Sequence, residues 1–133
     1  SFIDLGCGNG RVIYFLNKKL KINYTGVELF NNSYEYCSKI FKMLPNIKLL
    51  NKNFFDLDYN NLQYDCYFLN DPLKEVGEHN RLVKTIISSL EQSQKPLFVT
   101  VNLTEGKSEV FASMKLLYSL KISSRSINIY KYV

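Results

Sequence analysis

The stretch SFIDLGCGNGRV at the start of the chain restricts the fold more than any other feature of the sequence. One carboxylate, Asp4, interrupts an apolar run, and Gly6, Gly8 and Gly10 then occupy alternate positions. Glycine adopts backbone conformations that other residues avoid, and it places no Cβ in the path of an approaching group. The pattern predicts a strand, a loop and a helix, in which the loop either turns tightly or admits a ligand close to the main chain.

Strand-like and helix-like segments alternate along the rest of the chain. The predicted strands cover residues 2–7, 24–29, 47–53, 64–70, 96–102, 115–122 and 126–133. Only SSR separates the last two, so they should form an antiparallel hairpin. The βα units in series predict an open α/β sheet with parallel early strands and helices on both faces. Ligands of such sheets bind beyond the carboxyl ends of the strands.

Helical spacing also gives expectations for individual side chains. In the helix predicted at residues 10–20, the inward face should consist of Val12, Phe15, Leu16 and Leu20. The single histidine, His79, stands near the start of a later helix, where we expect it to be exposed and without a catalytic role.

The composition places the chain among globular proteins and limits its partners. Its 133 residues fit one domain, 1–133, and its opening directly in a strand suggests that sequence upstream is missing. The net charge of +5 comes from scattered lysines, so a nucleic acid stays open as a partner without being indicated. No apolar run approaches the roughly 20 residues of a membrane span. Three distant cysteines indicate buried, reduced thiols in the cytoplasm and no zinc site.

Two carboxylates give the glycine loop a chemical context. Glu28 ends the second strand, 18 residues beyond Gly10, where a carboxylate can accept hydrogen bonds from both hydroxyls of a ribose. Asp4 should lie at the rim of the same crevice, where it could meet a cation. The loop alone is equally consistent with a tight turn that binds nothing, but the two acidic residues favour a nucleoside-binding site.

The dinucleotide-binding interpretation fits this loop poorly. Its fingerprint is G-x-G-x-x-G, and Arg11 stands where the third glycine belongs. Asp4 would also repel a pyrophosphate group placed nearby. We therefore disfavour a nicotinamide oxidoreductase.

The stretches FIDLGCGNGRV and TGVEL together resemble motifs I and II of the class I (Rossmann-like) S-adenosylmethionine-dependent methyltransferases. The resemblance extends over nearly the whole chain, including the terminal hairpin that distinguishes this family from an ordinary Rossmann sheet. It implies seven strands in the order 3-2-1-4-5-7-6. It also implies S-adenosylmethionine as cofactor, without the family's N-terminal cap region, and leaves the methyl acceptor undefined.

The resemblance implies roles for residues that match the family's motifs. Asp4 and the loop would hold the methionine portion of the cofactor, Glu28 the ribose, and Leu29 or Phe30 the adenine. Asn53 would accept from the adenine amino group in place of the usual aspartate, while the Phe54 N–H would meet a ring nitrogen. The implied cofactor-binding residues are Asp4, Gly6, Cys7, Gly8, Gly10, Glu28, Leu29, Asn53, Phe54 and Asn70.

The fourth strand ends in Asn70-Asp71-Pro72-Leu73, which resembles the [D/N]PP[Y/F/W] motif of methyltransferases that act on amino groups. Asn70, Asp71 and Pro72 are therefore the candidate catalytic residues. Asp71 replaces a proline and could act as a base or attract a cationic amine. Leu73 replaces the aromatic residue, which disfavours a flipped nucleobase as acceptor. An ordinary strand-exit turn explains the motif equally well.

The sequence thus predicts a methyltransferase that moves a methyl group by in-line displacement to a nitrogen or oxygen nucleophile of a small molecule, protein or nucleic acid. The alternative is a cofactor-binding fragment or pseudoenzyme that is inactive without upstream residues.

Overall fold

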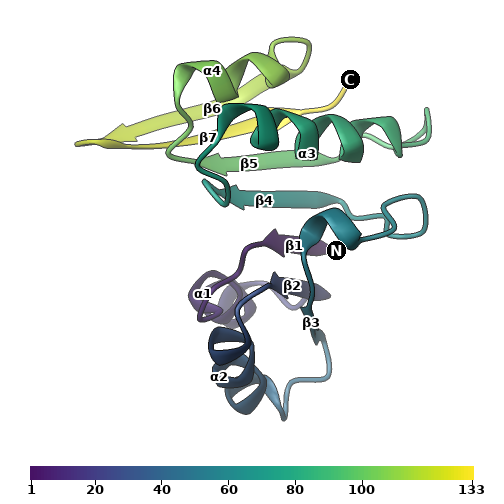
Figure 1. Cartoon of the computed structure of the whole chain (residues 1–133), viewed down its shortest axis with the longest axis vertical. Coiled ribbons are helices and arrows are strands. Elements are labelled where there is room, and N and C mark those ends of the chain that lie inside the picture. The colour runs from purple at the N-terminus through teal and green to yellow at the C-terminus, as the bar shows by residue number, and fades with distance from the viewer. The chain divides into compact units, whose positions relative to one another are not determined.

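The computed structural model describes residues 1–133, except for the side chain of Glu105. The described strands form one mixed seven-stranded sheet in the order β3-β2-β1-β4-β5-β7-β6, with helices around it (Figure 1). This order and the antiparallel C-terminal hairpin confirm the predicted fold class. The chain divides into two compact units, Ser1–Leu57 and Asp58–Val133.

The first unit contains three parallel strands and two helices. Its elements are β1 (Phe2–Leu5), α1 (Arg11–Lys19), β2 (Tyr24–Glu28), α2 (Asn31–Phe41), β3 (Ile47–Asn51) and the 3₁₀ turn η1 (Phe54–Asp56). Every residue of β1 and β2 is buried, as expected for strands inside a parallel sheet. In β2, Gly26 is required by space, because a Cβ there would lie 2.9 Å from atoms of Cys7, Ile13 and Leu49.

The inward face of α1 differs from the predicted one. Ile13 and Asn17 are buried, whereas Phe15 and Leu20 are exposed, so the prediction for those two residues was wrong. The helix instead turns Ile13 toward Gly26, where the missing side chain leaves room for it. The buried amide of Asn17 is satisfied because its Oδ1 accepts a hydrogen bond of 2.8 Å from Asn46 Nδ2.

The second unit contains two parallel strands extended by the hairpin. Its elements are β4 (Cys66–Asn70), α3 (Val76–Ser88), β5 (Leu97–Val101), α4 (Glu105–Ser108), the 3₁₀ turn η2 (Glu109–Phe111), β6 (Lys115–Ile122) and β7 (Arg125–Lys131). Strand β5 pairs in parallel with β4 and antiparallel with β7. A tight turn at Ser123, with φ of 54°, joins β6 to β7 (Figure 1).

Aromatic rings fill the core of the second unit. The rings of Tyr67 and Phe98 stack with centroids 5.3 Å apart, and those of Phe111 and Tyr130 stack at 4.7 Å. The apolar residues Leu82, Val83 and Ile86 of α3 are fully buried. His79 is buried as well, with 0% of its surface exposed, so the prediction of an exposed histidine was wrong. It lies edge-on to Phe111, with ring centroids 6.2 Å apart.

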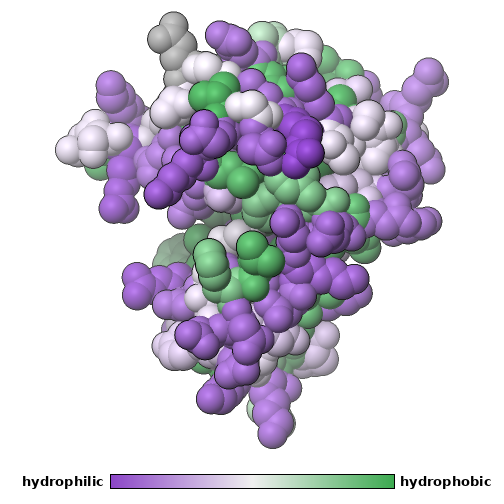
Figure 2. Space-filling view, in the orientation of Figure 1, coloured by the Kyte–Doolittle hydropathy of each residue, from purple (hydrophilic) through white to green (hydrophobic). Residues whose placement is uncertain are grey.

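Hydrophilic side chains predominate on the face of the molecule drawn in Figure 2. Strand β6 is different, because all eight of its residues are exposed although most are apolar. Among the described residues, the longest and most apolar helix still falls short of what crossing a membrane requires.

Candidate functional site

The loop between β1 and α1 depends on three glycines in left-handed conformations. Gly6, Gly8 and Gly10 have φ of 90°, 54° and 71°, a region that costs other residues about 1–2 kcal/mol. The Gly6 and Cys7 N–H groups both donate to the Val27 carbonyl at 2.9 Å. These bonds tie the start of the loop to β2.

Gly8 and Gly10 are glycines for different reasons. A Cβ at Gly10 would lie 2.6 Å from the ring of Phe41 and 3.1 Å from Cys37 Sγ, so α2 packs directly against this part of the loop. A Cβ at Gly8 would meet no atom within 4 Å. The main chain at Gly8 is therefore accessible, and a ligand can approach it closely.

Glu28 points its carboxylate at the glycine loop. Its Oε2 accepts a hydrogen bond of 2.8 Å from the Gly8 N–H, and its Oε1 accepts one of 2.8 Å from the Phe30 N–H. Each carboxylate oxygen can accept about two hydrogen bonds, so each retains capacity for another donor. Two vicinal hydroxyl groups can supply those donors.

Asp4 lies in β1 with 2% of its surface exposed. No hydrogen-bond donor among the described residues is paired with its carboxylate. Burial, and secondly the negative charge of Glu28, raise the pKa of Asp4 to about 7. An ionised carboxylate in this position is costly unless a cation reaches it. The first unit therefore suits a ligand that carries an ammonium group and ribose hydroxyls, as S-adenosylmethionine does.

Two cysteines hold the loop from below. Cys37, from α2, donates its thiol to the Gly8 carbonyl at 3.1 Å, and Cys7 Sγ lies 4.0 Å from the same oxygen. Burial raises the pKa of both thiols, which disfavours their ionisation. The contacts of Cys37 and Phe41 with the loop could not be predicted, because helical periodicity does not show which loop a helix face contacts.

The loops after β2 and β3 contribute further groups. Leu29 and Phe30 are exposed directly after Glu28, so their apolar surfaces can cover a ligand. Asn51 was also missed, and its side-chain amide donates to the Glu28 and Leu29 carbonyls at 2.9 and 3.2 Å. These two bonds fix the main chain that carries the Glu28 carboxylate. Its position at the end of the predicted third strand was the available signal.

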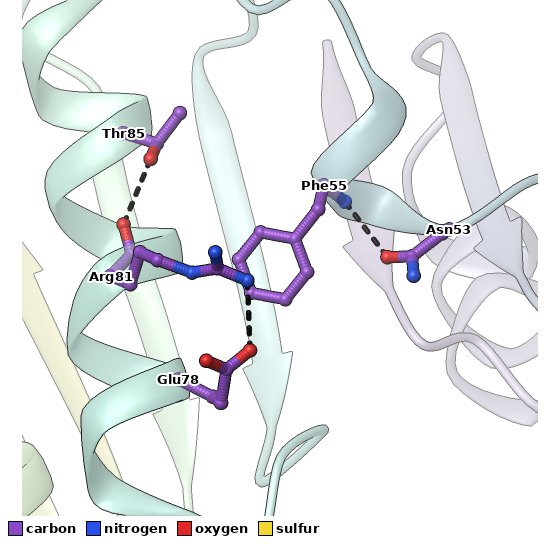
Figure 3. Close-up of polar contacts among 5 residues, drawn as sticks. All are labelled: Asn53, Phe55, Glu78, Arg81 and Thr85. Atoms are coloured by element: carbon purple, nitrogen blue, oxygen red, sulfur yellow. Dashed lines mark hydrogen bonds and ion pairs between the residues drawn. The ribbon is translucent and has the colours of Figure 1, made fainter.

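Asn53 has a local role that the sequence analysis did not predict. Its Oδ1 accepts a hydrogen bond of 3.0 Å from the Phe55 N–H and so caps η1 (Figure 3). The same oxygen retains capacity for a second donor. The ring of Phe54 contacts that of Phe55 edge-on, with centroids 5.3 Å apart.

The predicted catalytic residues lie in the second unit. Asn70 ends β4 and is exposed, and Asp71 follows with φ of 43° before Pro72. The Asp71 carboxylate accepts a charge-assisted hydrogen bond from Lys107 Nζ. The structure thus brings Asp4, the glycine loop and Glu28 together in one unit and places Asn70–Pro72 in the other.

The first unit also contains a groove of about 380 Å³. It is lined by Asn9, Arg11, Tyr14, Tyr36, Ile40 and Phe41. Asn9 belongs to the glycine loop, but none of the ten residues named above as implied cofactor-binding residues lines the groove.

A seven-stranded sheet in this order, with a glycine loop after β1 and a carboxylate at the end of β2, defines the Rossmann-like class I methyltransferases. A family model with the description "Methyltransferase domain" matches residues 2–93. The chain belongs to this family of S-adenosylmethionine-dependent methyltransferases. No curated protein matches the sequence.

Solved structures share the fold at low sequence identity. The yhhF protein from Escherichia coli superposes with a TM-score of 0.81 at 14% identity, covering 98% of this chain and 75% of its own. An RNA methyltransferase from Salinibacter ruber, in complex with S-adenosylhomocysteine, gives 0.77 at 13% identity and covers 98% and 78%. The N-methyltransferase NodS from Bradyrhizobium japonicum, also with S-adenosylhomocysteine, gives 0.77 at 9% and covers 98% and 76%.

Proposed function

We propose that residues of the first unit bind S-adenosylmethionine in the roles that the family motifs suggest. Asp4 offsets the ammonium group, the accessible main chain at Gly8 receives the methionine portion, and Glu28 accepts from the ribose hydroxyls. The observation that carries this proposal is the contact between Gly8 and Glu28, because it joins the loop and the carboxylate in one site. The buried carboxylate of Asp4 supplies the second anchor.

The adenine would lie among the groups that follow β2 and β3. Leu29 and Phe30 offer exposed apolar surface, and Asn53 keeps one acceptor position on Oδ1 after capping η1. The Phe54 main chain completes this proposed set, as in the family pattern.

We further propose that the acceptor is a nitrogen or oxygen nucleophile that approaches Asn70 and Pro72. When bound, the cofactor supplies an electrophilic methyl group on sulfur. The exposed Asn70 amide can accept a hydrogen bond from an amine and orient its lone pair. Leu73 offers no ring on which a flipped base could stack, which favours acceptors other than duplex bases. Three free cysteines support a cytoplasmic location.

Calorimetric titration with S-adenosylhomocysteine tests the cofactor site. Glu28→Gln removes the charge and one acceptor pair, and we expect it to weaken binding at least tenfold. Glu35→Gln is the matched control, because Glu35 is an exposed carboxylate of the same unit that bonds only Asn31. Equal affinity in the wild type and Glu28→Gln would refute the assigned role.

A transfer assay tests the activity. The protein is incubated with methyl-labelled S-adenosylmethionine and separate fractions of small molecules, protein, RNA and DNA, and label is counted in each. Label in one fraction identifies the acceptor class. Cofactor binding without label in any fraction would favour the alternative, a cofactor-binding module that needs further residues for catalysis.

A further inference from the structure

A buried lysine stands behind the turn that follows β4. Lys107 belongs to α4, and 2% of its surface is exposed. Its Nζ donates to the Asp71 carboxylate and, at 2.5 Å, to the Leu73 carbonyl. An unpaired ammonium would be strongly disfavoured at this depth, so these two acceptors are what make the position tenable. The two acceptors flank Pro72.

The turn needs such support because its own sequence supplies little. Asp71 adopts φ of 43°, a conformation that costs a residue with a Cβ about 1–2 kcal/mol. Pro72 has no N–H with which to close a turn. Lys107 donates hydrogen bonds to the residue before the proline and to the residue after it, and so holds both. One cation from another element thus fixes the chain that leaves Asn70.

Two residues of α3, Asn80 and His79, also bear on the surroundings of Lys107. Asn80 Nδ2 donates to the Gly106 carbonyl at 3.2 Å and so joins α3 to the residue before Lys107. His79 is fully buried, and burial, with a second contribution from Lys107, lowers its pKa to about 4. His79 is therefore neutral near pH 7 and adds no second positive charge. The Asp71 side chain retains 35% exposure, so the pair lies at the edge of the unit.

We propose that Lys107 is a positioning residue of the acceptor site, which holds Asn70 and Pro72 in place through Asp71 and Leu73. This proposal rests on the proposed function, in which the acceptor approaches that turn. In the related motif a proline follows the first residue and stiffens the turn, whereas here the ion pair does so. Asp71 is the counter-ion of Lys107 and does not take the proton from the methyl acceptor.

Nuclear magnetic resonance tests the positioning role without an acceptor. In Lys107→Met we expect the Leu73 carbonyl carbon and the Asn70–Leu73 backbone signals to shift, while those of β5 stay unchanged. In Lys107→Arg, which keeps the charge and the donors, these signals should lie close to their wild-type positions. The control is Arg81→Met, which breaks an exposed ion pair with Glu78 on α3 (Figure 3). Unmoved signals at residues 70–73, or equal shifts throughout the second unit, would overturn the proposal.

Asp71→Asn separates a counter-ion from a base, and its side chain is isosteric and partly exposed. The asparagine oxygen still accepts from Lys107 but cannot take a proton. With the acceptor found in the transfer assay, we expect Lys107→Met to lose at least tenfold in kcat, and Asp71→Asn to lose activity as well but to keep the pH profile of the wild type. Both should bind S-adenosylhomocysteine within twofold of the wild type. A pH profile of kcat that loses its acidic limb in Asp71→Asn would show that Asp71 acts as the base and would overturn its assignment as a counter-ion.

Failure of the proposed function has a different signature. In that case the wild type transfers no label, or Glu28→Gln binds as well as the wild type, whereas the magnetic resonance experiment still decides whether Lys107 holds the turn.

Discussion

The buried carboxylate of Asp4 makes cofactor affinity depend on pH. Its pKa is raised from 3.8 to about 7, first by burial and then by Glu28, so the free protein holds a proton there at pH 6. A ligand ammonium placed against Asp4 favours the ionised carboxylate, and binding must then release that proton. Affinity should therefore rise with pH and level off above the pKa.

The magnitude follows from the distance to the pKa. At pH 6, one unit below, about one carboxyl in ten is ionised, so the apparent Kd should be about tenfold higher than on the plateau near pH 8. Each further unit costs about another 1.4 kcal/mol of binding free energy. At pH 6 the release should approach about 0.9 proton per ligand, and at pH 7 about half a proton.

Calorimetry with S-adenosylhomocysteine from pH 5.5 to 8.5, in buffers of different ionisation enthalpy, measures both quantities. 5′-Methylthioadenosine is the matched ligand, because it keeps the nucleoside and sulfur but has no ammonium group. Its affinity should not change with pH, and neither should the affinity of Asp4→Asn for S-adenosylhomocysteine. A pH-independent affinity for S-adenosylhomocysteine, or an equal slope for both ligands, would refute the assignment of Asp4 to the ammonium.

Three further predictions concern stability and the loop. Gly8→Ala should cost about 1 kcal/mol of folding free energy and weaken S-adenosylhomocysteine binding at least tenfold. The control Gly77→Ala, in open space on α3, should gain about 0.5–1 kcal/mol of folding free energy and bind the ligand normally. Equal binding by the two variants would contradict an accessible loop. Because folding raises the pKa of Asp4 from 3.8 to about 7, the wild type loses stability as pH rises from about 4 to 7, and the loss is complete above pH 7. In urea melts Asp4→Asn should therefore exceed the wild type by about 2–4 kcal/mol at pH 8 and match it at pH 4. For His79 the stability changes with pH in the opposite direction, because its lowered pKa costs about 3 kcal/mol of folding free energy as pH falls from 6.5 to 4. His79→Phe should remove that loss. A variant as sensitive to acid as the wild type would contradict this prediction.

The fold could be predicted because its signals are local. Strand segments, the glycine loop and the short SSR link each appear within a few residues, and the family resemblance then supplied the strand order. Which face of α1 is buried could not be predicted in this way. Its apolar residues cover more than one face, and the choice of Ile13 over Phe15 depends on the space left by Gly26 in another element.

The residues of the candidate site likewise divide into those that local sequence predicts and those that depend on distant contacts. Asp4, the glycines and Glu28 follow from position in a βα unit, because the end of a strand determines where its side chain faces. The contributions of Cys37, Asn51 and Lys107 depend on contacts between residues that lie 23 to 36 positions apart. Burial of His79 likewise depends on Phe111, which a helical pattern around residue 79 does not contain.

Strand β6 has a practical consequence for handling the protein. It exposes Leu116, Tyr118 and Ile122 along an unpaired edge, the kind of surface on which strands of separate molecules join. Lys115 and Lys121 stand on the same strand, and mutual repulsion between such charges keeps copies apart. Salt near 1 M shortens the range of that repulsion to about 3 Å. Concentrated protein should therefore be most stable against association at low ionic strength. High salt should promote oligomers that associate through this edge.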